Sequence, residues 1–138
     1  MNATASSPAY RGSCLCGGVR YAIHAEIKAV THCHCQMCRK AHGAAFATYA
    51  SVPAAAHAFT EGSSLLRSYR SSPEVTRMFC GVCGSPLAWR RHVGEFSAWL
   101  SFPLGTLDSA YLPRTQKHVH TDAKAPWHVI ADDGPQSP

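Results

Sequence analysis

Short segments in which apolar and polar side chains alternate make up most of the sequence. Near the N-terminus, for example, the apolar residues Val19, Tyr21 and Ile23 stand two positions apart, with Arg20 between the first two. This is the spacing of a half-buried strand. Segments of this kind recur between turn signals, about every 8–12 residues. The pattern predicts about nine strands, the clearest over residues 10–16, 19–24, 29–34, 44–52, 65–69, 75–79, 87–90 and 96–102, with short segments at 117–120 and 127–130.

Helix signals are few. Residues 36–42 can form one or two helical turns before Gly43 stops them. Residues 54–64 have the composition of a loop, with a turn at Glu61-Gly62. The sequence therefore predicts an all-β fold with one very short helix, arranged as a sandwich or an open barrel.

The length of 138 residues suits one domain and is too short for two ordinary ones. We expect this domain to cover residues 10–133, between a flexible N-terminus at 1–9 and a flexible tail at 134–138. The hydrophobic fraction of 46% favours a folded chain over a disordered one. No apolar run approaches the roughly 20 residues of a membrane span, and the first residues have neither the basic start nor the apolar stretch of a secretion signal. The expected location is the cytoplasm.

Cysteine is the residue type that points to chemistry. Seven cysteines are an odd number, so complete disulfide pairing would leave one thiol over. Cysteines two residues apart would also bridge only with strain. Without a secretion signal, metal binding is the better interpretation. The cysteines fall into three groups: Cys14 and Cys16; Cys33, Cys35 and Cys38; and Cys80 and Cys83.

Metal binding would change the net charge, which is formally +5. Seven thiolates remove seven charges and two zinc ions restore four, which leaves about +2. The longest basic runs are two pairs, Arg39-Lys40 and Arg90-Arg91. Nucleic-acid binding proteins usually carry a clustered basic patch, so a nucleic-acid partner is not expected.

Cys80-Gly81-Val82-Cys83 has the form of a zinc knuckle, in which glycine lets the chain turn two sulfurs toward one ion. A structural zinc needs four ligands. Cys14 and Cys16 can supply the other two, because residues two apart in a strand project from one face. The alternative is that these are unrelated buried thiols.

The remaining group, Cys33-His34-Cys35-Gln36-Met37-Cys38, offers three sulfurs. Three protein ligands leave one position on a zinc ion open, as in catalytic sites. The spacing alone leaves open whether Cys14 or Cys16 joins this group instead. Three thiolates and a divalent ion sum to a charge of about −1, and such a soft centre suits an incoming thiol better than water. A thiol held as thiolate is a nucleophile for aldehydes, so the ligand set favours thiol–carbonyl chemistry over hydrolysis.

Three motifs now support a family resemblance: residues 12–19 (GSCLCGGV), 32–43 (HCHCQMCRKAHG) and 77–87 (RMFCGVCGSPL). Together with Tyr69-Arg70-Ser71-Ser72 and the segment 113–127 that contains His118, they resemble the glutathione-dependent formaldehyde-activating enzyme family. The resemblance covers roughly residues 10–133.

The resemblance implies a β-tent fold with two zinc ions per chain. It assigns the structural ion to Cys14, Cys16, Cys80 and Cys83, and the catalytic ion to Cys33, Cys35 and Cys38. The implied activity is that of a carbon–sulfur lyase, which joins glutathione reversibly to formaldehyde as S-hydroxymethylglutathione. The chain is compact, like the many relatives without an assigned substrate.

Other side chains are candidates for supporting roles. We call Cys33, Cys35 and Cys38 the triad. A histidine beside the triad can carry the proton of the adduct, and Arg39 suits a glutathione carboxylate. Aromatic residues either line a pocket or pack in the core. The candidates are His32, His34 and His42 for the proton, Phe46 and Tyr49 for the pocket, Met37 as an apolar neighbour, and Trp89, Trp99 and Trp127 as core residues; His34, between two ligands, should point away from them.

Two other functions compete with the enzyme. A non-catalytic, zinc-stabilised binding or adaptor module would have a closed second site and no turnover. A thiol redox or metal-buffer protein would exchange its zinc easily without dependence on aldehyde.

Overall fold

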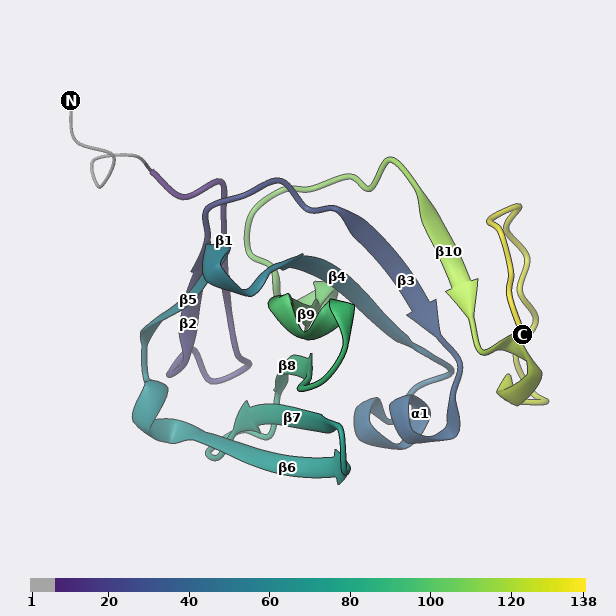
Figure 1. Ribbon diagram of the computed structural model, residues 1–138, viewed down its shortest axis with the longest axis horizontal. Helices are drawn as coiled ribbons and strands as arrows, with labels where there is room; N and C mark the ends of the chain where they lie inside the picture. Colours follow the sequence, from purple (N-terminus) through teal and green to yellow (C-terminus); the bar gives the residue numbers. More distant parts are fainter. Residues whose placement is uncertain (1–6) are drawn as a thin grey trace.

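In a computed structural model, which describes residues 7–138, two sheets and one α-helix form around a shared core (Figure 1). The smaller sheet has three strands in the order β1-β2-β5. These are β1 (Tyr10–Ser13), β2 (Arg20–Ile23) and β5 (His57–Glu61), all antiparallel. The strand predicted over residues 19–24 is therefore confirmed as β2 in the middle of this sheet, with Val19 just before it.

The larger sheet has seven strands in the order β10-β3-β4-β9-β8-β7-β6. Only the β10–β3 pair is parallel. The strands are β3 (Ala29–Cys33), β4 (Ala47–Pro53), β6 (Leu66–Ser72), β7 (Val75–Cys80), β8 (Pro86–Arg91), β9 (Trp99–Pro103) and β10 (Gln116–Val119).

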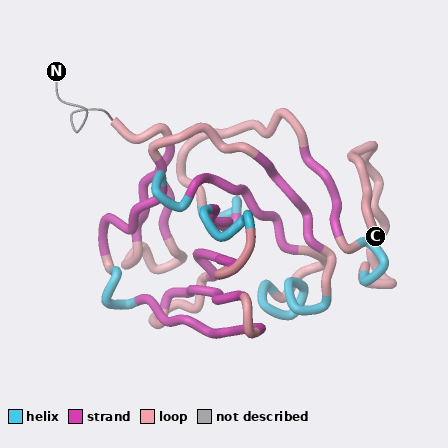
Figure 2. Tube along the Cα trace, viewed as in Figure 1, coloured by secondary structure: helices cyan, strands magenta, loops and turns pink. Residues whose placement is uncertain are grey.

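The helix α1 (Gln36–His42) occupies the predicted residues. Cys35 caps its start in an extended conformation, and Gly43 ends it with a left-handed φ of 60°, the conformation that favours glycine. Five 3₁₀ helices of three or four residues complete the elements, as Figure 2 shows between the strands. They are η2 (Ala54–Ala56), η3 (Ser63–Leu65), η4 (Glu95–Ala98), η5 (Leu104–Thr106) and η6 (Thr121–Ala123).

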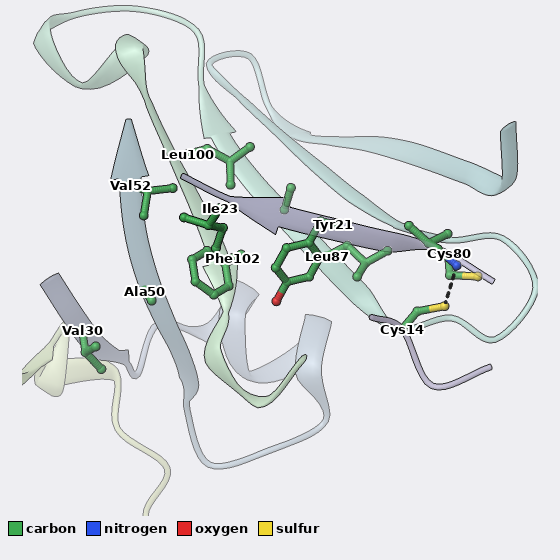
Figure 3. Close-up of a cluster of buried hydrophobic side chains, with 12 residues drawn as sticks. Cys14, Tyr21, Ile23, Val30, Ala50, Val52, Cys80, Leu87, Leu100 and Phe102 are labelled. Atoms are coloured by element: carbon green, nitrogen blue, oxygen red, sulfur yellow. Dashed lines mark hydrogen bonds between the residues drawn. The ribbon is translucent and has the colours of Figure 1, made fainter. Parts of the chain in front are cut away.

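The core lies between the two sheets (Figure 3). Along the large sheet, Val30 pairs with Ala50 and Ala50 with Phe102, and all three are buried. Tyr21 and Ile23 of the small sheet are also buried, in the same cluster. The buried Tyr21 hydroxyl is satisfied by Thr106, at 2.7 Å between oxygens.

The opposite face of the large sheet carries the residues between these core positions. Cross-strand pairing places Ala29 beside Ser51, Ser51 beside Ser101, Ser101 beside Trp89 and Trp89 beside Arg77. Because side chains alternate along each strand, this row projects away from the core. It forms the wall on which the candidate site is built.

Several expectations about local structure are wrong. The expected strand at 10–16 ends at Ser13, so Cys14 and Cys16 lie in the turn after β1 and not on one face of a strand. The expected loop at 54–64 contains η2 and β5, and the expected strand at 96–102 begins with η4, so that β9 starts at Trp99. The segment 127–130 contains no strand. Trp127 is 70% exposed rather than part of the core. Its segment has no strand neighbours to pack it. Trp89 packs against the smaller buried cluster, which contains Cys33 and Cys38, whereas Trp99 is half-buried and belongs to neither buried cluster, so the core prediction is wrong for Trp99 as well.

The ends of the chain are described in part. Residues 1–6 of the expected flexible N-terminus lie outside the described residues. At the other end, the amide of Ser137 donates to His118, and the amide of His118 donates to Pro135. The proposed tail therefore runs along β10. Among residues 7–138, no helix combines the length and the apolar character needed to cross a membrane.

Candidate metal centres

Four sulfurs meet where the two sheets approach each other. Cys14 and Cys16 follow β1, Cys80 ends β7, and Cys83 lies in the turn before β8. All four Sγ atoms lie within 4.8 Å of one another. Two of the separations are 3.6 Å (Cys14–Cys16) and 3.8 Å (Cys16–Cys80), close to the roughly 3.8 Å between sulfurs that a tetrahedral ion with Zn–S bonds of about 2.3 Å requires.

Backbone amides turn toward these sulfurs. The amide of Val19 donates to Cys14 Sγ at 3.3 Å, and that of Val82 donates to Cys80 Sγ at 3.4 Å. Such bonds offset the charge of a thiolate. The Ser85 side chain lowers the pKa of Cys83 to about 5 and also accepts a hydrogen bond from the Leu15 amide, at 2.8 Å. Ser85 therefore contacts both cysteine turns, at Leu15 in one and at Cys83 in the other.

The other three sulfurs lie at the junction of β3 and α1. Cys33 ends the strand, Cys35 caps the helix and Cys38 lies in its first turn. Their Sγ atoms are also within 4.8 Å of one another. Among the described residues, no histidine, carboxylate or further cysteine completes this group to four. Cys14 and Cys16 lie in the other cluster, so the alternative partition left open by the spacing is not the one observed.

A cavity of about 400 Å³ opens over this triad. Cys33, Cys35 and Cys38 are part of its lining, and residues from all seven strands of the large sheet also line it. The large sheet curls, so that α1 lies beside the β6–β7 hairpin (Figure 1), and the contact between Arg77 and Cys38 joins them. The other lining residues are Thr31, Met37, Tyr49, Ser71, Ser72, Val75, Arg77, Trp89, Arg91, Ser101, Val119 and His120.

Arg77 is the residue that the sequence analysis missed. Its Nη2 donates to Cys38 Sγ at 3.6 Å, its Nη1 to the Tyr49 hydroxyl at 3.1 Å and its Nε to Ser71 Oγ at 3.0 Å. These bonds use three of the five N–H donors of a guanidinium group. The sequence offers one signal for it, since Arg77 begins the motif RMFCGVCG, but its position over the triad depends on how β7 pairs within the sheet.

The electrostatics of the triad follow from these contacts. The hydrogen bond with Cys33, together with Arg77, lowers the pKa of Cys38 to about 5. Burial raises the pKa of the Tyr49 hydroxyl, and the Cys38 charge raises it further. Tyr49 therefore stays a neutral hydroxyl beside a charged sulfur and a charged guanidinium.

The three histidine candidates have different surroundings. His32 bonds to Thr48 and Gln116, each at 2.8 Å, and does not line the cavity. His42 bonds to the Tyr49 hydroxyl at 3.1 Å and so reaches the cavity through one residue. His120, which was not a candidate, lines the cavity directly.

His34 is fully buried away from the cavity. Its Nε2 meets Nδ1 of His118 at 2.8 Å, and Nε2 of His118 meets Asp132 at 2.9 Å. Burial lowers the pKa of His34 to about 4. This chain of side chains ties the strand that carries Cys33 to the C-terminal segment, which indicates a supporting role.

The other candidates divide in the same way. Tyr49 and Met37 line the triad cavity, whereas Phe46 packs against the rings of His32 and His34 and does not line it. Arg39 is absent from the cavity lining.

The arrangement can be compared with known proteins. The family model described as "Glutathione-dependent formaldehyde-activating enzyme" matches residues 9–123. A crystal structure of a Rhodobacter sphaeroides protein superposes with a TM-score of 0.61 at 21% identity, covering 73% of this chain and 90% of that one, which supports the fold. A comparison with curated proteins gives no match. The family match spans most of the chain, including all seven cysteines, and the chain belongs to the glutathione-dependent formaldehyde-activating enzyme family.

Proposed function

We propose that this protein is a zinc-dependent carbon–sulfur lyase that makes or breaks the adduct of a thiol and an aldehyde, such as S-hydroxymethylglutathione. Glutathione is the proposed thiol and formaldehyde the proposed aldehyde, as in the description of the family. One observation carries the proposal: a group of three cysteine sulfurs lines a cavity large enough for a small molecule.

We propose two zinc ions per chain. Cys14, Cys16, Cys80 and Cys83 would hold one with all four positions filled, which is the form of a structural site. Cys33, Cys35 and Cys38 would hold the other. A zinc ion with three thiolate ligands keeps an added thiol in its nucleophilic thiolate form.

The protein's own groups then have separate tasks in the reaction. The thiol loses its S–H proton, the sulfur lone pair forms a bond to the carbonyl carbon, and the C=O π pair moves to oxygen. That oxygen takes up one proton, so the reaction as a whole moves the thiol hydrogen to oxygen. Arg77 has two N–H donors beyond its bonds to Cys38, Tyr49 and Ser71. Its guanidinium is thus positioned to stabilise the developing oxyanion.

Apolar side chains form part of the walls of the cavity. Val75 is buried, and Trp89 and Val119 are half-buried around the cavity. Water removal strengthens the attraction between the guanidinium and an oxyanion. The proton carrier is a separate question, for which His42, bonded to Tyr49, and His120, in the lining, are the candidates.

The cavity also favours an enzyme over an adaptor module. An adaptor needs a stable surface and has no use for three thiols in the lining of a concave site. We place the activity in the cytoplasm, where thiols remain reduced.

The direct test is magnetisation exchange between ¹³C-formaldehyde and S-hydroxymethylglutathione in the presence of the zinc-loaded protein. We expect exchange faster than in buffer with the same zinc and glutathione, and we expect Cys35→Ser to abolish the acceleration. Equal exchange rates with and without the wild-type protein would contradict the proposal.

A further inference from the structure

A second cavity adjoins the first on the same face of the large sheet. It measures about 420 Å³ and is lined by Lys28, Ala29, Ser51, Trp89, Arg91, Phe96, Trp99 and Ser101. Trp89, Arg91 and Ser101 also line the triad cavity. We call the residues of the second cavity that are not shared (Lys28, Ala29, Ser51, Phe96 and Trp99) the outer groove.

The sheet register explains why the two cavities are neighbours. Ala29, Ser51, Ser101 and Trp89 form consecutive cross-strand pairs, and the hydroxyls of Ser51 and Ser101 bond at 2.9 Å. This row leads from the outer groove to Trp89, whose next neighbour across the sheet is Arg77 beside the triad. A single extended ligand can therefore lie across the sheet and touch both cavities.

The outer groove has an aromatic surface. Phe96, on η4, is 61% exposed, and Trp99 is half-buried at the start of β9. With Trp89 they place three aromatic rings around one concavity. Exposed aromatic side chains gathered in a hollow are typical of sites that bind apolar or aromatic groups.

The charge around both cavities has one sign. Arg77, Arg91 and Lys28 are among the lining residues, and no aspartate or glutamate is. Arg91 pairs with Glu74 outside the lining, where both side chains are about half exposed. Among residues 7–138, no ion pair involves Lys28. Its ammonium group is therefore available for an anion.

We propose that the outer groove binds the part of the ligand that is remote from the reacting sulfur, and that this part is an aromatic group carrying a carboxylate. The ring packs against Trp99 and Phe96, and the carboxylate meets Lys28. The inference rests on the proposed function, because the sulfur of such a ligand lies at the triad. It extends that function from formaldehyde itself to adducts with a bulky aryl acid substituent.

The groove can be tested without any sulfur chemistry. Isotope-labelled, zinc-loaded protein is titrated with 3-phenylpropionate, with 3-phenyl-1-propanol, which lacks the carboxylate, and with propionate, which lacks the ring. We expect 3-phenylpropionate to bind about tenfold more tightly than either fragment, a difference of about 1.4 kcal/mol. The indole N–H signal of Trp99 should shift during the titration, and that of Trp127 should stay unchanged.

Matched variants locate the two contacts. Lys28→Gln should remove the preference for the carboxylate, and Trp99→Leu should weaken both aryl probes about tenfold. Two variants serve as controls. Arg70→Gln removes an exposed cation on β6 that lines neither cavity, and Trp127→Leu removes an exposed tryptophan outside both cavities. Unchanged affinity in Lys28→Gln and Trp99→Leu, or a shift at Trp127 instead of Trp99, would overturn the proposal.

A bifunctional probe tests the link between the cavities. A thiol that carries an arylalkyl carboxylate should bind more tightly than 2-mercaptoethanol, and Lys28→Gln should reduce that advantage. Equal affinity of the two thiols would show that the groove does not serve the triad ligand and would overturn the inference. If the protein fails to accelerate formaldehyde exchange but binds 3-phenylpropionate through Lys28 and Trp99, the formaldehyde function fails and the groove stands.

Discussion

Arg77 is the residue on which the charge of the candidate active site depends. Three thiolates and a divalent ion would carry a net charge of about −1, and the Arg77 guanidinium, bonded to Cys38, brings the site close to neutral. A further thiolate would then add charge to a neutral centre instead of an anionic one. We expect Arg77 to affect both the binding of a thiol and the retention of the metal.

Arg77→Met should lower the thiol-dependent turnover by about 10²-fold, in the range found when one oxyanion donor is removed. It should also speed the loss of metal from the triad to a chelator, because the thiolates lose their balancing charge. Arg77→Lys should recover little, because Cys38, Tyr49 and Ser71 are bonded by three different nitrogens of the planar guanidinium, whereas lysine carries its three donors on one nitrogen. Steady-state kinetics and chelator competition measure the two effects separately.

Arg70→Met is the control for this variant. Arg70 lies on the neighbouring strand β6, is exposed and faces away from the triad cavity. If both methionine variants lose metal at the wild-type rate, Arg77 does not balance the charge of the triad.

Gly12 is a residue on which the stability of the fold depends, for a steric reason. A Cβ atom at this position would overlap the ring of Tyr21, which is buried in the core. Gly12→Ala should therefore lower the free energy of unfolding by about 1–3 kcal/mol, the usual cost of overpacking. The control is Gly105→Ala, because a Cβ at Gly105 meets nothing within 4 Å. Chemical denaturation of the two variants gives the comparison, and equal stabilities would contradict the steric interpretation.

At the scale of elements, local sequence patterns were enough to identify most strands and the helix. They did not show which strands pair with one another. The strand β5 was missed because residues 54–56 are three alanines and Glu61-Gly62 gives a turn signal, which together mask the short run between them. The same limit applies to the site. The cysteine spacing identified three local groups of sulfurs but left open how they combine, and the structure brings them together as four and three. Arg77 and the outer groove depend on cross-strand neighbours such as Trp89, which no local pattern contains.

The strand β5 gives a pH-dependent prediction. His57 stacks on Tyr21 with ring centroids 5.0 Å apart, and burial lowers its pKa to about 4 from the ordinary 6.5. Below pH 6.5 the unfolded chain therefore takes up a proton that the folded chain does not. This loss of stability begins as the pH falls through 6.5 and ends near pH 4.

Between pH 7 and 5.5, His57 alone should cost the folded state about 1 kcal/mol. His57→Phe, which keeps a ring beside Tyr21, should flatten the pH dependence by that amount, and His24→Gln should not, because His24 is exposed. Denaturant titrations at both pH values measure the difference. Parallel curves for wild type and His57→Phe would contradict a lowered pKa of His57 in the folded protein.

At the scale of the whole molecule, the two cysteine clusters differ in how much chain they connect. The four-cysteine cluster joins the turn after β1 to the end of β7, and Cys16 and Cys80 are 64 residues apart. It therefore links the small sheet to the large one. The triad lies within residues 33–38, where β3 already leads directly into α1. Closing a long loop restricts the unfolded chain far more than closing a short one.

This difference predicts opposite outcomes for two serine variants. Structural zinc sites contribute on the order of 10 kcal/mol coupled to folding, which is comparable with the whole stability of a domain, about 5–15 kcal/mol. Cys83→Ser should therefore lose cooperative thermal unfolding. Cys35→Ser should keep the wild-type circular dichroism spectrum and a cooperative transition while losing thiol-dependent activity.

Metal content separates the two clusters further. We expect about two zinc ions per wild-type chain and about one in Cys35→Ser, the remaining ion being held by four sulfurs. Elemental analysis after gel filtration measures this ratio on the samples used for the thermal scans. If Cys35→Ser and Cys83→Ser lose the fold to the same extent, the division of the two clusters into a structural and a catalytic site is wrong.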